Sequence, residues 1–127
     1  MNEDRATLTT LLASEGYDLV TSGEGLEARH AERFNLMVRF NAQGATFRVF
    51  FRCEPHATAS SLHALCNTLN ATATACRFFT RANGGDFVME GWQPFPCHEP
   101  SLRTFLSAWN HDSVLFKKSE DARSLLC

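Results

Sequence analysis

The sequence predicts an α+β domain in which helices cover one face of an antiparallel sheet of about five strands. Apolar residues recur at helical spacing near the start, the middle and the end of the chain, and alternate at a period of two in between. The connections between successive strands are short enough to be hairpins, which pair strands antiparallel. The order helix, strands, helix, hairpin, helix then places the helices on one face of the sheet.

The first element is a helix over residues 3–14. Leu8, Leu11 and Leu12 share one of its faces, and Gly16 follows as a terminating glycine. Residues 17–21 are expected to form a short strand. Residues 26–33 have helical propensity but lie between strands, and we expect an extended edge there.

Alternating apolar residues predict a first hairpin, with strands over residues 34–40 and 46–52 and a turn that contains Gly44. Pro55 ends its second strand. A helix follows, capped by Ser60 or Ser61. Its buried face comprises Leu62, Leu65, Cys66 and Leu69.

A second hairpin is predicted from residues 76–81 and 86–92, joined by a turn at Ala82-Asn83-Gly84-Gly85. Pro100 suits the first turn of the last helix. That helix presents an apolar stripe of Leu102, Phe105, Leu106, Trp109 and Phe116. We expect a single domain over residues 1–127, with a core over about 5–116 and a charged tail over 117–127 that frays.

Composition limits the class of protein. The 127 residues are 44% hydrophobic and 20% charged, as in a globular domain. Twelve basic and 14 acidic residues give a net charge of −2, which excludes a globally basic nucleic-acid binder. The N-terminal residues are polar, no apolar run is long enough for a membrane helix, and five cysteines form no C-x-x-C pair. These features predict a cytoplasmic protein with reduced thiols.

Arginines on the predicted strands are the strongest candidates for a binding site. Residues 34–92 carry five basic and three acidic side chains, whereas residues 1–33 carry three basic and seven acidic ones. The guanidinium group suits carboxylates or phosphates, and aromatic residues of the same parity add apolar contact area. The predicted partner-binding residues are Arg39, Arg48, Arg52, Arg77, Arg81, Phe50, Phe79 and Trp92.

Two other interpretations of these residues stay open. The arginines also suit a solvated sheet face on which they pair with Glu54, Asp86 and Glu90. Aromatic residues in the C-terminal half, namely Trp92, Phe95, Trp109 and Phe116, suit either a partner-binding groove or a core. The net charge and the scarcity of Lys argue against single-stranded nucleic acid as the partner.

Metal binding is the alternative chemistry. Cys53-x-x-His56 and His63-x-x-Cys66 offer four zinc ligands, but Cys66 lies on the apolar helix face and the spacing between the pairs is short. No metal or cofactor is therefore assigned, and a metal- or small-ligand-sensing domain is the second hypothesis.

Catalytic motifs are not evident in the sequence. Cys97-His98 lacks a third partner, and Asp86 and Glu90 fit solubilising strand positions. Gly84-Gly85 links two strands instead of leading into a helix, so it is not a phosphate loop. We therefore expect no enzymatic activity.

The chain resembles the YbjN-type family of bacterial sensory transduction regulators. The resemblance covers residues 5–116. It lies in Leu11-Leu12-x-x-Glu15-Gly16-Tyr17, the hairpin around Val38-Arg39-Phe40 and Phe47-Arg48-Val49, residues 69–79, the motif at residues 84–91 and the closing helix. It implies a fold similar to that of class I type III secretion chaperones, which are small dimeric proteins that hold partner segments. The resemblance thus implies a homodimeric, chaperone-like or regulatory protein-binding domain.

Overall fold

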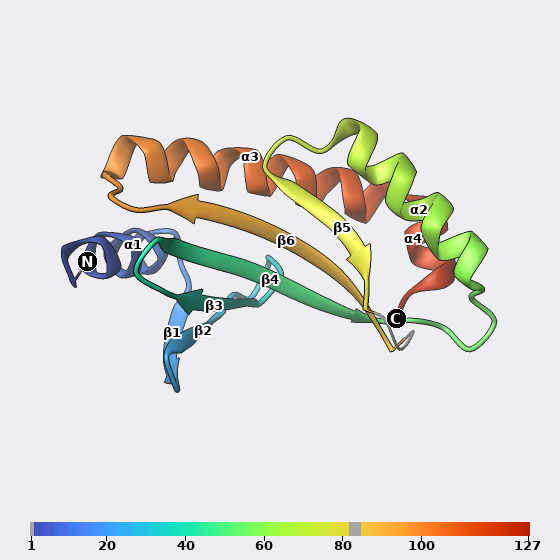
Figure 1. Cartoon of the computed structure of the whole chain (residues 1–127), viewed down its shortest axis with the longest axis horizontal. Helices are drawn as coiled ribbons and strands as arrows, with labels where there is room; N and C mark the ends of the chain where they lie inside the picture. Colours follow the sequence, from blue (N-terminus) through green and yellow to red (C-terminus); the bar gives the residue numbers. More distant parts are fainter. Residues whose placement is uncertain (1, 82–84) are drawn as a thin grey trace.

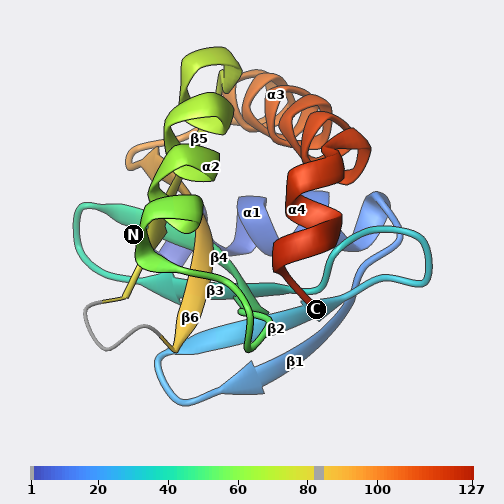
Figure 2. The ribbon, with the colours of Figure 1, turned by 90° about the vertical axis from the view of Figure 1, so that its right-hand side faces the viewer.

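The computed structural model describes residues 2–81 and 85–127. Four helices lie on one side of a six-stranded sheet whose order is β1-β2-β3-β4-β6-β5, with every neighbouring pair antiparallel (Figures 1 and 2). The elements are α1 (Asn2–Ser14), β1 (Asp18–Ser22), β2 (Gly25–Arg29), β3 (Leu36–Phe40), β4 (Gly44–Arg52), α2 (Ala59–Thr72), β5 (Cys76–Thr80), β6 (Asp86–Pro94), α3 (Glu99–Lys118) and α4 (Glu120–Leu125). The predicted α+β architecture is confirmed, with six strands instead of about five.

The additional strand comes from the ambiguous stretch after the first turn. Residues 25–29 are extended, as expected, but β2 pairs with both β1 and β3 and is therefore not an edge. Phe34 lies in the connection before β3 instead of in the strand, because residues 30–35 cross from β2 to β3. The edge strands of the sheet are β1 and β5.

One detail of the middle of the chain differs from the sequence prediction. The N-cap of α2 is Thr58 and not Ser60 or Ser61, and Thr58 and Ser61 form a reciprocal capping box. The predicted second hairpin is present as β5 and β6. Residues 82–84 of its predicted turn lie outside the described residues.

The C-terminal tail does not fray. Residues 120–125 form α4, which buries Ala122, and Leu126 is 7% exposed and forms a β-bridge with Cys53 at the end of β4. The Cys127 N–H also donates to the Arg52 carbonyl (2.8 Å). The charged residues of this segment led to the expectation that it frays, but its apolar residues Ala122 and Leu126 cover the end of the core.

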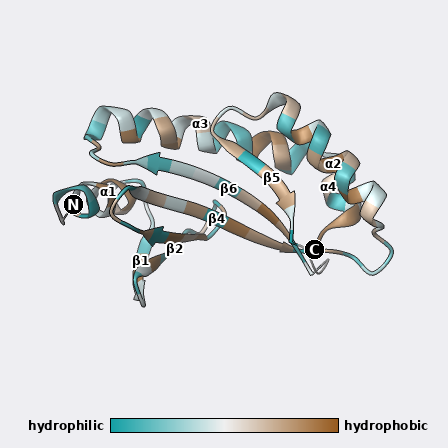
Figure 3. Ribbon diagram, in the orientation of Figure 1, coloured by the Kyte–Doolittle hydropathy of each residue, from teal (hydrophilic) through white to brown (hydrophobic). Residues whose placement is uncertain are grey.

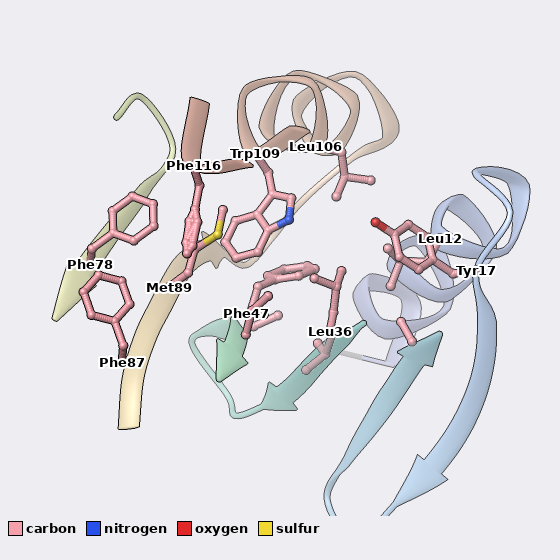
Figure 4. Packing of buried hydrophobic residues seen from close by; sticks show 14 of the residues in the cluster. Leu12, Tyr17, Leu36, Phe47, Phe78, Phe87, Met89, Leu106, Trp109 and Phe116 are labelled. Carbon is pink, nitrogen blue, oxygen red and sulfur yellow. The ribbon is translucent and has the colours of Figure 1, made fainter. Parts of the chain in front are cut away.

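The core lies between the sheet and the helices. Phe47, Phe87 and Met89 point from the strands towards Trp109 and Phe116 of α3 (Figure 4). A Cβ atom added at Gly91 would lie 2.9–3.0 Å from the Phe105 and Trp109 rings, so glycine allows α3 to pack closely on β6. Residues along β4 are mostly hydrophobic, whereas α2 and α3 carry both hydrophilic and hydrophobic residues, as expected for helices with one buried face (Figure 3).

Helix α2 closes one edge of the sheet. The Phe78 N–H of β5 donates to Asn70 Oδ1 (2.7 Å), and Asn70 Nδ2 donates to the Phe78 carbonyl (2.9 Å). The amide of Asn70 thus occupies the place of a further strand at this point of β5, which restricts edge-to-edge pairing there.

Candidate functional site

The sheet has a face that the four helices leave uncovered, and we call it the open face (Figure 2). Register places its side chains in rows: Met37, Arg48, Glu90 and Arg77 are successive cross-strand partners, as are Phe50, Val88 and Phe79. Together with Val20, Glu27, Arg39, Thr46, Arg52, Arg81, Asp86 and Trp92, these residues belong to the open face. All eight residues predicted for partner binding therefore lie on one surface.

Glu90 is the centre of the charged part of the open face. The Arg48 Nε–H donates to Glu90 Oε2 (2.6 Å), and Arg77 donates to Glu90 Oε1 from Nε (2.9 Å) and Nη2 (2.6 Å). The Glu90 side chain is only 10% exposed, against 36% for Arg48 and 70% for Arg77. A buried carboxylate is thus neutralised by two more accessible guanidinium groups.

The surroundings of Glu90 change its proton affinity. Burial raises the pKa of this carboxyl, but the hydrogen bonds from Arg77 and Arg48 and the charges of both guanidinium groups together outweigh burial and hold the pKa below its ordinary value. Glu90 is therefore ionised at neutral pH. Arg48 and Arg77 have a structural task, namely to compensate this charge.

A small apolar cluster continues the open face beside the Glu90 group. Val88 lies between Phe50 and Phe79 in register and is fully buried. The Arg81 guanidinium lies 4.7 Å from the centre of the Phe50 ring and also pairs with Asp86 (3.6 Å), and Arg77 lies 5.1 Å from the Phe79 ring. Cation–π contacts thus hold two of the arginines over the aromatic rings.

Arg39 and Arg52 differ from the other three arginines. Both are exposed, and within residues 2–81 and 85–127 neither forms an ion pair. The predicted set thus divides in two. Three arginines, Arg48, Arg77 and Arg81, compensate acidic residues of the same sheet, as the solvated-face interpretation expected for Asp86 and Glu90. The other two, Arg39 and Arg52, stay available for an external anion.

Exposed apolar side chains gather on the same surface. Among the described residues, five large hydrophobic side chains are exposed, and four of them belong to the open face. These four are Val20, Met37, Phe50 and Trp92, which are 37–45% exposed. Their concentration on the helix-free face distinguishes it from the rest of the surface.

The predicted aromatic groove is not formed. Trp109 and Phe116 are 1% and 4% exposed and belong to the core, whereas Trp92 lies on the opposite side of the sheet. Phe95 packs partly buried against the core. The alternation of β6 separates Trp92 from α3, and the core interpretation holds for the other three residues.

The candidate metal ligands are not brought together. Cys53 lies at the end of β4, His56 and His63 are exposed, and Cys66 is buried on the inner face of α2. Throughout the part of the chain that the structure describes, no three His, Cys, Asp or Glu side chains are placed to share a metal ion.

Cys97 and His98 also have local roles. The Cys97 N–H donates to Asp4 Oδ1 (2.8 Å), and burial together with Asp4 raises the pKa of the Cys97 thiol to about 11. His98 is the N-cap residue of α3, and its Nδ1 lies 2.9 Å from Ser101 Oγ. A thiol with a raised pKa is protonated at neutral pH, which is the reverse of what an activated nucleophile requires.

Sequence reasoning missed three features. Met37 and Val20 belong to the open face. Met37 is two residues before Arg39 on the same strand, and this spacing was the signal that both side chains share a face. Asp112 is 1% exposed on α3 and accepts hydrogen bonds from the backbone N–H groups of Thr74, Ala75 and Cys76 at 2.7–3.1 Å. Its signal was a carboxylate on the apolar stripe of the last helix.

These features define an α+β domain with one helix-covered and one open sheet face. A crystal structure of YbjN from E. coli, provisionally described as a transcription regulator, has the same fold: the TM-score is 0.67 over 96% of this chain and 94% of that chain, at 15% sequence identity. The chain therefore has a YbjN-like fold. No family model and no curated protein matches the sequence. Within the described residues, no helix combines the length and the apolar character needed to cross a membrane.

Proposed function

We propose that the chain is a non-enzymatic protein-binding module of the regulatory or chaperone-like class, and that its open face holds an extended acidic segment of a partner protein. The observation that carries this proposal is the concentration of exposed apolar side chains on that face. Met, Trp and Arg are enriched in protein interfaces, and Trp and Arg are frequent hot spots. The open face presents Met37, Trp92, Arg39 and Arg52 together.

The chemistry of the partner follows from the free cations. Arg39 and Arg52 offer planar forks to carboxylates, and Met37, Phe50 and Trp92 offer apolar contact on the same face. A segment in which acidic and apolar residues alternate matches this arrangement. The exposed apolar side chains of this face and the net charge of −2 favour such a segment over a polyanionic nucleic acid.

The family resemblance adds two elements to the proposal. The module acts in the cytoplasm, and it forms a homodimer, as the dimeric relatives imply. Sedimentation equilibrium of the purified chain measures the second element directly. A monomer at all concentrations up to the millimolar range would remove the homodimer from the proposal and leave the open face available on each copy.

The experiment compares surface variants with matched controls. Phe50→Ala/Trp92→Ala removes apolar contact, and Arg39→Ala/Arg52→Ala removes the free charges. Val114→Ala, an exposed apolar residue on α3, and Lys118→Ala, an exposed cation of the same helix, are the controls. Peptides are selected from a displayed random library on the wild-type chain, and their affinities are then measured for all variants.

We expect the selected peptides to be rich in Asp, Glu and apolar residues. Each open-face double variant should weaken their binding by at least about tenfold, and each control by less than about twofold. Thermal unfolding of the double variants should be close to that of the wild type, because these side chains are partly exposed. Peptides that bind the controls and the open-face variants equally well would refute the assignment of the site.

A further inference from the structure

A cavity that is open to solvent lies away from the open face, where the C-terminal segment covers the end of the core. It has a volume of about 310 Å³, which is at the lower end of the range for small-molecule sites. The connection before β3, the end of β4, the end of α3 and α4 form its walls. The segment that the sequence predicted to fray is therefore one wall of a cavity.

Three aromatic rings form the apolar part of this cavity. Phe51 stacks on Phe116 with ring centres 4.5 Å apart, and Phe34 meets both rings edge-on at 5.2 and 5.8 Å. Phe34 and Phe51 remain partly exposed, so their free surfaces face the cavity that they line. These rings can contact an aliphatic or aromatic body but offer no hydrogen bond to it.

The small size of Ala122 leaves this space open. Ala122 is 4% exposed and lines the cavity from α4, together with Leu126. Backbone hydrogen bonds hold the end of the segment in place, since Glu54 N–H donates to the Leu125 carbonyl and Cys127 N–H donates to the Arg52 carbonyl, each at 2.8 Å. The cavity is thus bounded by anchored backbone and not by a loose tail.

The polar lining side chains of the cavity include two cations. Lys117 and Arg123 line it, and none of the lining side chains is acidic. Lys117 Nζ lies 4.7 Å from the centre of the Phe34 ring and donates to the Glu32 carbonyl (3.4 Å). Within the described residues neither Lys117 nor Arg123 forms an ion pair. An apolar cavity beside two uncompensated cations is complementary to a molecule with an apolar body and one anionic group.

We propose that this cavity binds a small amphipathic carboxylate, with its apolar body against Phe34, Phe51 and Phe116 and its carboxylate at Lys117 and Arg123. The ligand joins α4 to the connection before β3 and so stabilises the C-terminal segment. This site is independent of the open face, because its aromatic lining residues lie on the helix-covered side of the sheet. The proposal therefore gives the domain a small-molecule input in addition to its protein-binding surface.

The test uses decanoate as the probe, kept below its micelle concentration, with decanol and decyltrimethylammonium as neutral and cationic analogues. Calorimetry on the full chain should show one decanoate per chain, with at least about tenfold weaker binding of either analogue. Lys117→Gln/Arg123→Gln should weaken decanoate binding by at least about tenfold, because one tenfold step corresponds to a single charge-assisted contact. Lys118→Gln is the matched control and should change the affinity by less than about twofold.

A filling variant tests the position of the apolar body. Ala122→Leu places three more carbon atoms in the cavity and should reduce decanoate binding while leaving both cations in place. Circular dichroism and thermal unfolding establish that this variant is folded; if it is not, Phe34→Trp is the filling variant. Equal binding of the three probes, decanoate binding that is unchanged in the charge and filling variants, or no binding at millimolar concentration would overturn the proposal.

Discussion

Two carboxylates are buried on opposite sides of the strands β5 and β6, and they are compensated in different ways. Glu90 points from β6 to the open face, where side chains of the two neighbouring strands donate to it. Asp112 points from α3 to the start of β5, where three consecutive backbone N–H groups donate to it. Both arrangements satisfy a buried charge, but only the first uses groups that can change partner.

The difference separates a surface that can exchange partners from a structural anchor. Arg77 is 70% exposed, so a partner carboxylate can approach it without unfolding the sheet. The N–H groups that bind Asp112 belong to the connection between α2 and β5 and to the first residue of β5, and their geometry is fixed by the backbone. Loss of Asp112 therefore acts on the fold, whereas changes around Glu90 act on both stability and the binding surface.

Replacement of Asp112 should have the largest effect on stability. Asp112→Ala leaves three backbone donors without their acceptor and should lower the free energy of unfolding by about 3 kcal/mol. Asp112→Asn keeps one carbonyl acceptor and should lose less. Urea unfolding of both variants measures the difference. A loss below about 0.5 kcal/mol in Asp112→Ala, the size expected for an ordinary surface position, would contradict the anchoring role.

Removal of the arginines around Glu90 should have an intermediate effect. Arg48→Ala/Arg77→Ala leaves a mostly buried carboxylate without partners and should cost about 2 kcal/mol, less than for a fully buried ion pair because Arg77 is largely exposed. Of the single variants, Arg48→Ala should cost more than Arg77→Ala, because Arg48 is the less exposed of the two.

The matched control for this comparison is Arg39→Ala/Arg52→Ala, which removes two arginines of the same face that have no ion-pair partner among the described residues. Its free energy of unfolding should differ from that of the wild type by less than about 0.5 kcal/mol. Equal losses in the two double variants would show that the division of the arginines into compensating and free groups is wrong.

The open face was predictable because strand alternation acts locally. Once Arg48, Glu90 and Arg77 are placed on strands, their parity assigns them to one face, and only register is needed to bring them together. The same reasoning placed Phe50 and Phe79 beside them. Which arginines are compensated was not predictable from register alone, since Arg52 is the direct cross-strand partner of Asp86, but the side chain of Asp86 pairs with Arg81.

The helix-covered side and the C-terminal segment were harder to predict because their contacts join distant parts of the chain. Asp112 binds backbone groups 36–38 residues away, and no local pattern indicates such a partner. Leu126 pairs with Cys53 across an even longer separation. The charged residues of the tail, considered alone, predict exposure to solvent. The burial of Ala122 and Leu126 depends on their contact with the end of the core, which no local pattern indicates.

The smallest expected effect concerns pH. Because the pKa of Glu90 is lowered in the folded chain from its ordinary value of 4.5, its ionised form stabilises the fold above about pH 4.5, and this contribution is lost as the pH falls through the lowered pKa. Glu90→Gln removes the titration. The wild type should therefore exceed the variant in stability by about 1 kcal/mol near pH 7, and the difference should shrink on acidification to about pH 3. A stability difference that stays constant between the two pH values would show that Glu90 acts through packing. The pairing with Arg48 and Arg77 would then not set the charge of Glu90 apart from that of Asp112.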